Sequence, residues 1–385
     1  MTHIFSVVPP RLGGIDMLLP IYLEMKRSGS VNIELIFVDD FVFRQLERDD
    51  FLFAQVSNCV DKISFLPKKN IKASSNPVIM FYRLLLFFLK FSGVLYRIIN
   101  THKPVMMHSG RLSSSLLRIF HQAIKFRGGC TVAHFNLMLL DVSNDKKKIN
   151  AQDDFGDIFI CFDKKNVSSW DNSSKNKCIE IGYPRLYESW LEILRNNSKY
   201  YVQKHIKETA AQMLPLVVLF LPSTVKDVFD DDELKDWIFE TVSCLSEHFD
   251  DALIVLKPHP MQNFKHLVSV LDELNNQKCI VSFLHPGILA AEAKLVISHH
   301  STSIFDALAS KTPVIQHQNF TPHWLQRHPE GSFLLDLGHP WTKNVDDLMV
   351  ELNKIKNNEW VPPNFVEHIG HRNSIKALFE KIELH

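Results

Sequence analysis

Short apolar runs alternate along the chain with segments whose apolar residues recur at helical spacing. Apolar runs lie over residues 4–8 and 33–39, and the segment between them, 15–25, has the spacing of a helix. Strand, helix and strand in this order predict a βαβ unit in a parallel sheet. The same pattern predicts a helix over 113–126 and further strands over 104–108, 130–134, 158–162 and 178–181.

The alternation starts again at Leu214, after a polar segment over 186–212 that has the character of an interdomain connection. In this second half, the acidic stretch from Asp227 to Asp236 is expected to start a helix that continues to His248. Strands are expected over 216–221, 252–256, 279–283, 295–298 and 314–315. The sequence therefore predicts two Rossmann-like doubly wound α/β domains, residues 1–190 and 213–343, and a helical tail over 344–385 that packs back on the first domain.

Composition and charge narrow the class of protein. The 43 Lys and Arg residues balance 43 Asp and Glu residues, so a protein whose main task is to bind nucleic acid is disfavoured. The six cysteines are scattered without a CxxC pair, which favours buried free thiols in a reducing compartment. The N-terminus lacks the regions of a signal peptide and is expected to form the first strand. We therefore expect a cytoplasmic location.

The most hydrophobic segment, residues 77–99, has nearly the length of a membrane span. Arg83, Lys90 and Arg97 recur in it at seven-residue intervals and would share one face of a helix. Each charge inside a bilayer costs roughly 3 kcal/mol, so a spanning helix is disfavoured. A buried helix with one polar stripe and an interfacial helix with Phe and Leu in the lipid both stay open. The interfacial helix would bind the protein peripherally to the cytoplasmic face of the inner membrane.

Three polar loops follow strands of the second half. Ligands of open parallel sheets bind at the carboxyl ends of the strands, which selects residues 222–224, 257–260 and 299–303. The first of these loops contains Ser223 and Thr224. All three supply hydroxyls, cations or both, as a site for a charged ligand requires.

The side chains of two of these loops suit a phosphate. Ser301, Thr302 and Ser303 precede a predicted helix, where hydroxyls and free amides can bind phosphate oxygens, although an N-cap is the ordinary role of such residues. Lys257 and His259 can offset phosphate charge, and His259 can also donate a proton to a leaving group. A rigid turn is the structural alternative for that loop.

Other motifs are weak or missing. Gly13 and Gly14 form an N-terminal loop after the first strand, where amides can face an anion, but a tight turn explains them equally well. His299 and His300 are neighbours on a strand and so point apart, which disfavours a shared metal. No HExxH, Walker A, GxSxG or GxGxxG motif is present, and metalloprotease, P-loop NTPase and α/β-hydrolase hypotheses lose their main support.

The loop with His259 and Pro260, followed some forty residues later by the stretch from Ser301 to Pro313, resembles the donor half of bacterial surface-polysaccharide glycosyltransferases. Sialyl-, polysialyl- and Kdo-transferases carry a similar His-Pro motif and a later Ser-Ser/Thr motif. The CDP-glycerol polyol-phosphate transferases share a comparable Ser-Ser…Phe-Asp stretch. Residues 181–185 also resemble the segment before the interdomain linker of these enzymes. The resemblance covers about residues 157–316 and implies the GT-B fold, with the active site in a cleft between two Rossmann-like domains.

The resemblance also implies roles for particular residues. A nucleotide-activated donor would be bound through its phosphate, with His259 assisting the leaving group. Such enzymes generally need no metal or cofactor, because the nucleotide-sugar is a substrate and protein groups supply the electrostatic stabilisation. The donor-binding residues implied are Ser223, Thr224, Lys257, Pro260, Ser301, Thr302 and Ser303.

The catalytic base is expected in the first domain, and two candidates depart from the patterns of the family. Asp153 and Asp154 correspond to the acidic pair of sialyltransferase-type enzymes, but Phe155 stands before the glycine. His134 follows a strand, as the base of the polyol-phosphate transferases does, but Phe135 replaces their glycine. A solvated strand entry and an ordinary buried histidine are the structural alternatives.

These observations favour a glycosyltransferase that moves a sugar from a nucleotide donor, with a CMP-linked ulosonic acid such as Kdo or sialic acid preferred, to a lipopolysaccharide or capsule glycan. A CDP-glycerol or CDP-ribitol polyol-phosphate transferase is the alternative, in which His134 is essential. A nucleotide-sugar epimerase of the same fold is less favoured, because its acidic and glycine-rich signatures are missing. A catalytically inactive GT-B binding subunit stays open because both base motifs depart from their patterns.

Overall fold

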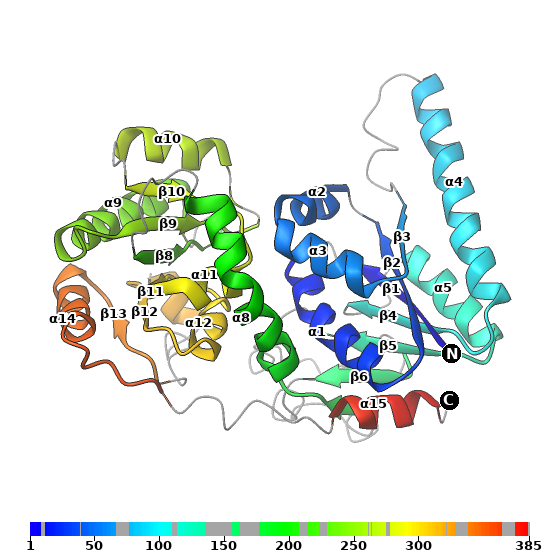
Figure 1. The fold of residues 1–385 in the computed structure, drawn as a ribbon. Helices are drawn as coiled ribbons and strands as arrows, with labels where there is room; N and C mark the ends of the chain where they lie inside the picture. The colour runs from blue at the N-terminus through cyan, green and yellow to red at the C-terminus, as the bar shows by residue number, and fades with distance from the viewer. Residues whose placement is uncertain are drawn as a thin grey trace. The chain divides into compact units, whose positions relative to one another are not determined.

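A computed structural model of the chain describes most residues and divides them into two compact units. Unit 1 comprises residues 1–190 and 369–385, and unit 2 comprises residues 191–368 (Figure 1). The described residues are 1–8, 12–38, 40–66, 77–109, 114–134, 156–161, 177–207, 215–222, 229–260, 262, 264–274, 278–320, 322–327, 338–363 and 374–383.

Unit 1 is built on a seven-stranded parallel sheet with the order β3-β2-β1-β4-β5-β6-β7. The first βαβ unit is present as predicted, with β1 and β2 in parallel register from Thr2↔Val31 to Val8↔Phe37. Burial on both faces explains why these strands are almost continuously apolar. The strands are β1 (Thr2–Val8), β2 (Val31–Phe37), β3 (Lys62–Phe65), β4 (Val105–Ser109), β5 (Cys130–His134), β6 (Ile158–Cys161) and β7 (Cys178–Glu180).

Helices cover both faces of this sheet, as in a doubly wound fold. On one face, α4 (Pro77–Asn100) and α5 (Ser115–Phe126) pack on residues of β1, β2 and β4. On the other, α1 (Leu12–Ser28) contacts α2 (Asp40–Arg48) and α3 (Asp50–Cys59) (Figure 1). Local sequence sets two of the helix starts, because the side chains of Asp49 and Ser114 accept hydrogen bonds from Leu52 N and Leu117 N at 3.0 and 3.2 Å.

Unit 2 contains a six-stranded parallel sheet with the order β10-β9-β8-β11-β12-β13. The strands are β8 (Leu216–Phe220), β9 (Leu253–Lys257), β10 (Cys279–Val281), β11 (Ala293–Ser298), β12 (Val314–His317) and β13 (Trp341–Thr342). The helices are α9 (Asp231–His248), α10 (Phe264–Leu274), α11 (Pro286–Glu292), α12 (Ile304–Ala309), α13 (Pro322–Arg327) and α14 (Val345–Lys356). Both sheets therefore have the architecture predicted from the apolar pattern.

One helix of unit 2 is confirmed and one strand was missed. Helix α9 begins at Asp231, within the predicted acidic stretch, and ends at His248 as predicted, and a capping box formed by Asp230 and Glu233 fixes its first turn. The two-residue strand β13 was missed, since a segment that pairs with β12 only through Gln316↔Trp341 and His317↔Thr342 is too short to show alternation.

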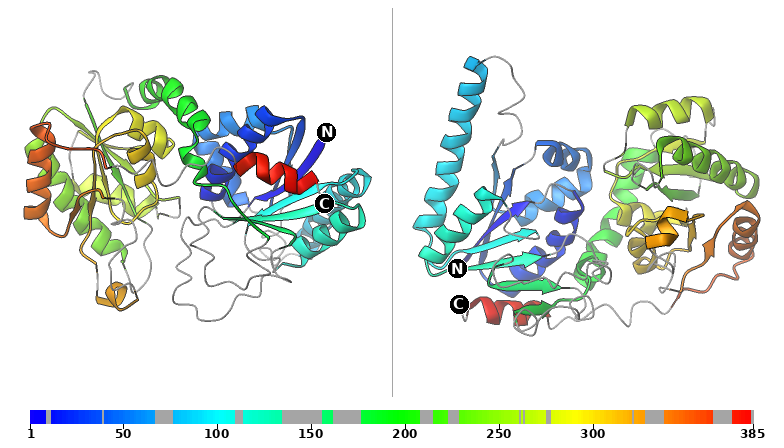
Figure 2. Two further views of the ribbon diagram at one scale, coloured as in Figure 1. Left: turned by 90° about the horizontal axis from the view of Figure 1, so that it is seen from below. Right: turned by 180° about the vertical axis from the view of Figure 1, so that it is seen from behind.

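The tail over 344–385 is not one element, and its prediction is wrong for its first helix. Leu348, Leu352 and Ile355 of α14 are buried in the core of unit 2, together with residues of β8 and β9. Only α15 (Ser374–Glu383) belongs to unit 1, where it contacts α1 and β7 (Figure 2). The apolar spacing of the two helices is the same, so the sequence pattern does not distinguish their partners.

The chain first passes from unit 1 to unit 2 near the start of a helix. Helix α8 (Glu188–Val202) runs into a single π-helical segment, η4 (Gln203–Lys207). At the start of α8, Trp190 is fully buried against Phe51 of unit 1, with ring centroids 5.7 Å apart. Further along, the hydroxyl of Ser198 donates to Glu292 of unit 2 at 2.7 Å.

Candidate functional site

The strand order of unit 2 identifies a topological switch point. The chain proceeds from β8 to β9 and β10 on one side of the sheet and from β11 to β12 and β13 on the other. Neighbouring strands β8 and β11 therefore send their connections in opposite directions at their carboxyl ends. Ligands of open α/β sheets bind in the crevice at such a point. The loop that follows β11 lies directly beside it.

Register brings two of the predicted loops to the same edge. Lys257 of β9 and Ser298 of β11 both pair with Phe220 of β8, so the three strands end in one row. His259 and Ser301 lie two and three residues beyond this row. Because β9 and β11 are separated by two strand spacings, about 10 Å, residues of both loops are within reach of one phosphate-bearing ligand.

The loop after β11 carries hydroxyls that the protein leaves available. Ser301, Thr302 and Ser303 are half-buried, and the Ser301 hydroxyl accepts a hydrogen bond from the amide of Ser303 at 3.3 Å. Ser303 is the N-cap of α12, yet its side chain makes no capping hydrogen bond. Within the described residues, the hydroxyls of Thr302 and Ser303 have no protein partner. The side chain of Ser303 therefore does not act as an ordinary N-cap.

Lys257 lies at the end of β9. Its side chain is buried, and its ammonium group donates to the backbone carbonyl of Phe283 at 3.0 Å. In this position Lys257 ties the end of β9 to the segment after β10 rather than projecting from the sheet edge. The half-buried His259 and Pro260 follow it, and the carbonyl of His259 accepts from the amide of Gln262 at 2.9 Å. This leaves His259 as the proton-donating candidate of the loop.

Two buried polar groups at the end of β11 lack protein partners. Within the described part of the chain, neither the hydroxyl of Ser298 nor Nδ1 of His299 makes a hydrogen bond. Buried polar atoms of native proteins are normally satisfied by protein, water or ligand. Their position beside the switch point is consistent with a site that other molecules complete.

A polar cluster that the sequence prediction missed lies at the ends of β12 and β13. His317 Nδ1 is 2.8 Å from the hydroxyl of Thr342, and His339 Nε2 is 3.3 Å from the side-chain oxygen of Gln316. The indole of Trp237 donates to the carbonyl of His317 at 2.9 Å. The polar residues that end the otherwise apolar strand β12 are the feature of the sequence from which this cluster could have been predicted.

Burial keeps the histidines of this region neutral. The pKa of His299 is lowered to about 3, mainly by burial and further by His300 and His317. The pKa values of His317 and His339 are each lowered to about 4, again mainly by burial. These groups act at neutral pH as uncharged hydrogen-bonding or packing groups.

The replacement His299→Phe is expected to make the stability of unit 2 less sensitive to acid. Because the folded-state pKa lies below the ordinary value of 6.5, the unfolded state takes up a proton first, and stability is lost as the pH falls below about 6.5. At pH 5 this loss is about 2 kcal/mol for His299. The ring packs on Phe229 and Trp237, with centroids 4.3 and 5.5 Å away, and phenylalanine preserves that packing.

Urea unfolding of the wild type and the variant between pH 5 and 8 measures this difference. The control is His248→Gln, which changes a half-buried histidine at the end of α9. An unchanged dependence on pH in His299→Phe would show that His299 does not titrate as its burial requires.

Unit 1 has its own switch point between β1 and β4. Gly13 and Gly14 lie near it, but the structure places both in the first turn of α1 and not in a loop, so that prediction is corrected. Helix α1 spans Leu12–Ser28. The amide groups of a first helical turn still lack partners within the helix.

The base candidates are placed only in part. His134 is the last residue of β5, at the carboxyl edge of the sheet as predicted, and it is buried. Asp153 and Asp154 lie outside the described residues, as do Ser223 and Thr224 of unit 2. Gly156 has a φ of +92°, and a Cβ there would lie 2.3 Å from the Thr131 hydroxyl oxygen. The turn into β6 therefore requires this glycine for structural reasons alone.

The segment before the connection is fixed by a buried ion pair. Arg185 follows β7 in the 3₁₀ turn η3 (Pro184–Leu186), and one of its Nη atoms lies 3.2 Å from a carboxylate oxygen of Asp16 in α1. Both side chains are almost completely buried. The motif over 181–185 thus has a structural function, which is to dock the last part of unit 1 on α1.

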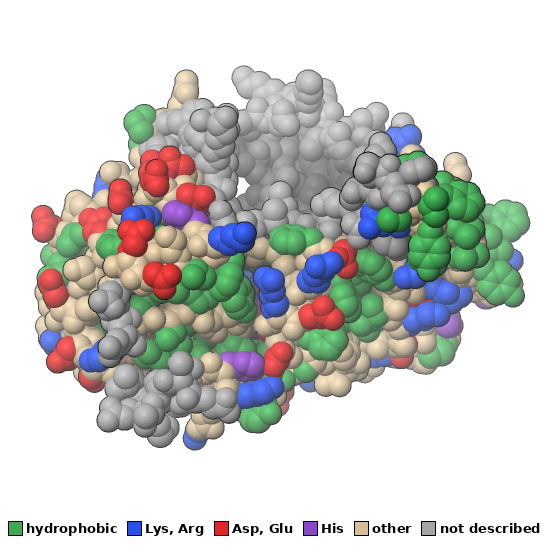
Figure 3. All heavy atoms as spheres, turned by 90° about the horizontal axis from the view of Figure 1, so that it is seen from above, with side chains coloured by type: hydrophobic (Ala, Val, Ile, Leu, Met, Phe, Trp, Pro, Cys, Tyr) green, Lys and Arg blue, Asp and Glu red, His purple; other side chains and the backbone are tan. Residues whose placement is uncertain are grey.

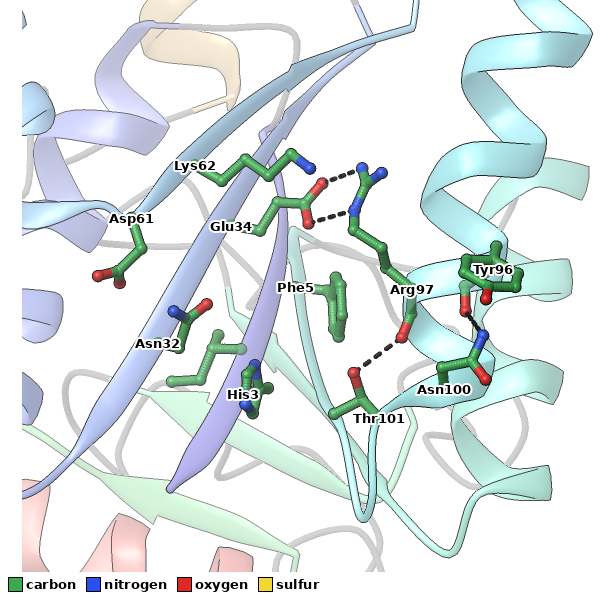
Figure 4. A pocket seen from close by; sticks show the side chains of 11 residues that line it. His3, Phe5, Asn32, Glu34, Asp61, Lys62, Tyr96, Arg97, Asn100 and Thr101 are labelled. Atoms are coloured by element: carbon green, nitrogen blue, oxygen red, sulfur yellow. Dashed lines mark hydrogen bonds and ion pairs between the residues drawn. The ribbon is translucent and has the colours of Figure 1, made fainter.

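A groove of about 380 Å³ lies at the opposite end of the unit 1 sheet, at the amino ends of β1, β2 and β3 (Figure 4). Its central feature is a bidentate ion pair, in which Arg97 of α4 donates to Glu34 of β2 at 2.9 and 2.6 Å. Ligands of such sheets bind at the carboxyl ends, and we do not assign the donor site to this groove. Among the described residues, no group of three or more His, Cys, Asp or Glu side chains is arranged to hold a metal ion.

Comparisons with known proteins support the architecture. Neither protein-family profiles nor curated proteins match the sequence. Among solved structures, UDP-GlcNAc 2-epimerase from Neisseria meningitidis, bound to UDP-GlcNAc, is 12% identical with a TM-score of 0.60 over 100% of each chain. The chain has the GT-B fold.

Two further solved structures of this fold are similar over the whole chain. The wall teichoic acid polymerase TagF is 13% identical with a TM-score of 0.55, over 100% of this chain and 88% of that one. A glycosyltransferase from Rickettsia africae is 13% identical with a TM-score of 0.52, over 100% of this chain and 98% of that one. At these identities the likeness establishes the fold, and the chemistry must be argued from the residues.

Proposed function

We propose that the protein is a glycosyltransferase that uses a nucleotide-activated sugar as donor. The observation that carries this proposal is that two loops, one with His259 and one with Thr302 and Ser303, begin at the same carboxyl edge of the unit 2 sheet, beside its switch point. Hydroxyls that have no protein partner among the described residues, at the same sheet edge as a histidine, suit the phosphate of a nucleotide that must leave. The neighbours of this fold include one protein named as a glycosyltransferase and two epimerases bound to UDP-GlcNAc.

The donor sugar can be narrowed to two classes. The His-Pro and Ser-Thr motifs favour a CMP-linked ulosonic acid such as Kdo or sialic acid. Neighbours named for UDP-GlcNAc favour a UDP-linked sugar. In both cases the proposed acceptor is a hydroxyl of a lipopolysaccharide or capsule glycan.

The proposed chemistry contains two proton transfers. The acceptor oxygen bonds to the anomeric carbon while the bond from that carbon to the phosphate oxygen breaks, and the nucleotide leaves with the electron pair. His259 donates a proton to the departing phosphate, and Thr302 and Ser303 donate hydrogen bonds to its other oxygens. The acceptor proton passes to a base of unit 1, for which Asp153, Asp154 and His134 are the candidates.

Two other functions are favoured by particular observations. An epimerase is favoured by the epimerase structure with the TM-score of 0.60. A polyol-phosphate transferase is favoured by the similarity to TagF and by the position of His134 at the carboxyl end of β5. These alternatives differ from the proposal in the bond that breaks, and product analysis separates them.

The test is mass spectrometry of donor mixtures incubated with the full chain. A glycosyltransferase releases free UDP from a UDP-sugar or CMP from a CMP-sugar, with water as a slow substitute acceptor, and EDTA is expected to leave this release unchanged. Release of CMP from CDP-glycerol indicates polyol-phosphate transfer, and an isomerised donor with its nucleotide bond intact indicates an epimerase. Absence of every product would contradict catalysis and favour an inactive binding subunit.

A further inference from the structure

Helix α4 presents a long apolar surface to solvent. Judged by length and composition alone, the segment Val78–Asn100 is long and apolar enough to cross a membrane. Few of its residues are buried in the protein. Seven large side chains lie on one side of the helix, each between 46% and 74% exposed. We call this the outer face of α4, and its members are Val78, Phe81, Tyr82, Leu85, Phe88, Leu89 and Tyr96. Burial of the whole helix, one of the two structural hypotheses for this segment, is therefore wrong.

The charges of α4 lie on the side away from the outer face. Arg97 makes its bidentate ion pair with Glu34 and also donates to the hydroxyl of Ser64 at 3.0 Å. The Lys90 ammonium lies 5.6 Å from the ring centre of Phe65. At 100° per residue, Arg83 falls on the same side as these two. The charged residues in the middle of α4 therefore do not prevent the outer face from contacting lipid.

The C-terminal third of α4 anchors the helix in unit 1. Val94 and Ile98 are fully buried with Phe120 of α5, and Phe91 stacks on that ring with centroids 5.4 Å apart. The part of the helix before Phe91, residues 78–90, is about 20 Å long, and a bilayer core is about 30 Å thick. Since its last turns belong to the protein core, α4 is placed to lie in a surface and not to cross it.

The sequence around α4 is strongly basic, and in the structure Arg97 and Lys125 of this stretch pair with Glu34 and Asp157 at 2.6 and 3.0 Å. Between Lys62 and Leu140 the sequence contains twelve Lys or Arg residues and no Asp or Glu, although the whole chain is neutral. Arg118 and Lys125, both exposed on α5, belong to this basic segment. Figure 3 shows apolar side chains gathered at the edge of the molecule where α4 lies, with Lys and Arg side chains beside them.

We infer that the outer face of α4 inserts into the headgroup region of an anionic lipid surface. Apolar patches of this kind seldom stay in water on a soluble protein, so the face requires a cover. Apolar and aromatic side chains flanked by cations match the acyl boundary and the anionic headgroups of a bilayer. A second copy of this chain fits less well, because two such basic segments would repel each other. The inference does not depend on the proposed transferase activity.

Vesicle co-sedimentation of the full chain tests the inference. One variant replaces Phe81, Leu85, Phe88 and Leu89 by serine. A matched control replaces four apolar residues that are similarly exposed elsewhere, namely Tyr200, Phe264, Val350 and Val361, by serine. Vesicles of phosphatidylcholine alone are compared with vesicles that also contain phosphatidylglycerol, and circular dichroism melting verifies that each variant is folded.

The wild type and the control are expected to bind phosphatidylglycerol vesicles, and the outer-face variant is expected to partition at least about tenfold less. Raising the salt concentration from about 0.1 to 1 M should weaken binding, because the Debye length falls from about 10 to 3 Å. Binding equal in both variants, binding insensitive to lipid charge, or no binding would overturn the inference. Sedimentation equilibrium completes the test: a wild-type dimer that the outer-face variant dissociates would assign the face to a second copy.

Discussion

The variant His259→Ala is expected to release nucleotide from its donor about 100- to 10,000-fold more slowly than the wild type. The reason is that alanine cannot protonate the departing phosphate. His259 is half-buried in a loop at the sheet edge, beyond the last residue of β9, and its removal leaves the strand register of unit 2 intact. The melting temperature should therefore change little. The measurement is the initial rate of nucleotide release with saturating donor.

Two further variants separate proton transfer from simple contact. His259→Asn keeps a hydrogen-bond donor without a transferable proton and should be nearly as slow as His259→Ala. His102→Ala removes an exposed histidine of unit 1 and should release nucleotide at the wild-type rate. Full activity of His259→Ala would show that His259 has no role in the reaction and that the nucleotide departs without a proton from His259.

The variant Asp16→Ala is expected to destabilise unit 1 by about 3–5 kcal/mol, which corresponds to a drop in Tm of roughly 6–20 °C. It leaves the guanidinium of Arg185 buried without the carboxylate that lies 3.2 Å away. The cost comes mainly from the unbalanced buried charge, since the net stabilisation by a buried pair is small. Thermal unfolding followed by circular dichroism measures the change.

The double variant Asp16→Leu/Arg185→Met distinguishes this explanation from a general packing defect. With both charges replaced by apolar groups, most of the lost stability should return. A single variant as stable as the wild type, or a double variant as unstable as Asp16→Ala, would contradict the role given to the ion pair.

Much of the fold was accessible from the sequence because parallel strands are buried on both faces. The strand β5 was located to the residue, and the remaining predicted strands to within a few residues. Such runs are apolar, short and bounded by turns, which makes them visible without tertiary information. Segments 40–48 and 50–59, which form α2 and α3, were not assigned, and the partner of α14 depended on packing that no local pattern encodes.

The candidate site was only partly predictable. The loops of His259 and Ser301 were found because strand ends can be identified from sequence. The orientation of Lys257 could not be predicted, since it depends on the carbonyl of Phe283 in a loop 26 residues away. Two features became visible only with the burial of β11: the Ser298 hydroxyl, which has no partner among the residues that the structure describes, and the neutral His299. The order of the strands, in which β8 lies next to β11, could likewise be determined only from the structure.

The central claim is that the carboxyl edge of the unit 2 sheet binds the phosphate of a donor nucleotide. Isothermal titration calorimetry of the full chain with UDP, CMP and CDP tests it, with the double variant Thr302→Ala/Ser303→Ala as comparison. We predict saturable binding of at least one nucleotide, weakened about tenfold or more in the variant, because each hydrogen bond to a charged phosphate contributes about 1.5–3 kcal/mol. No binding by the wild type, or equal affinity in the variant, would contradict the claim.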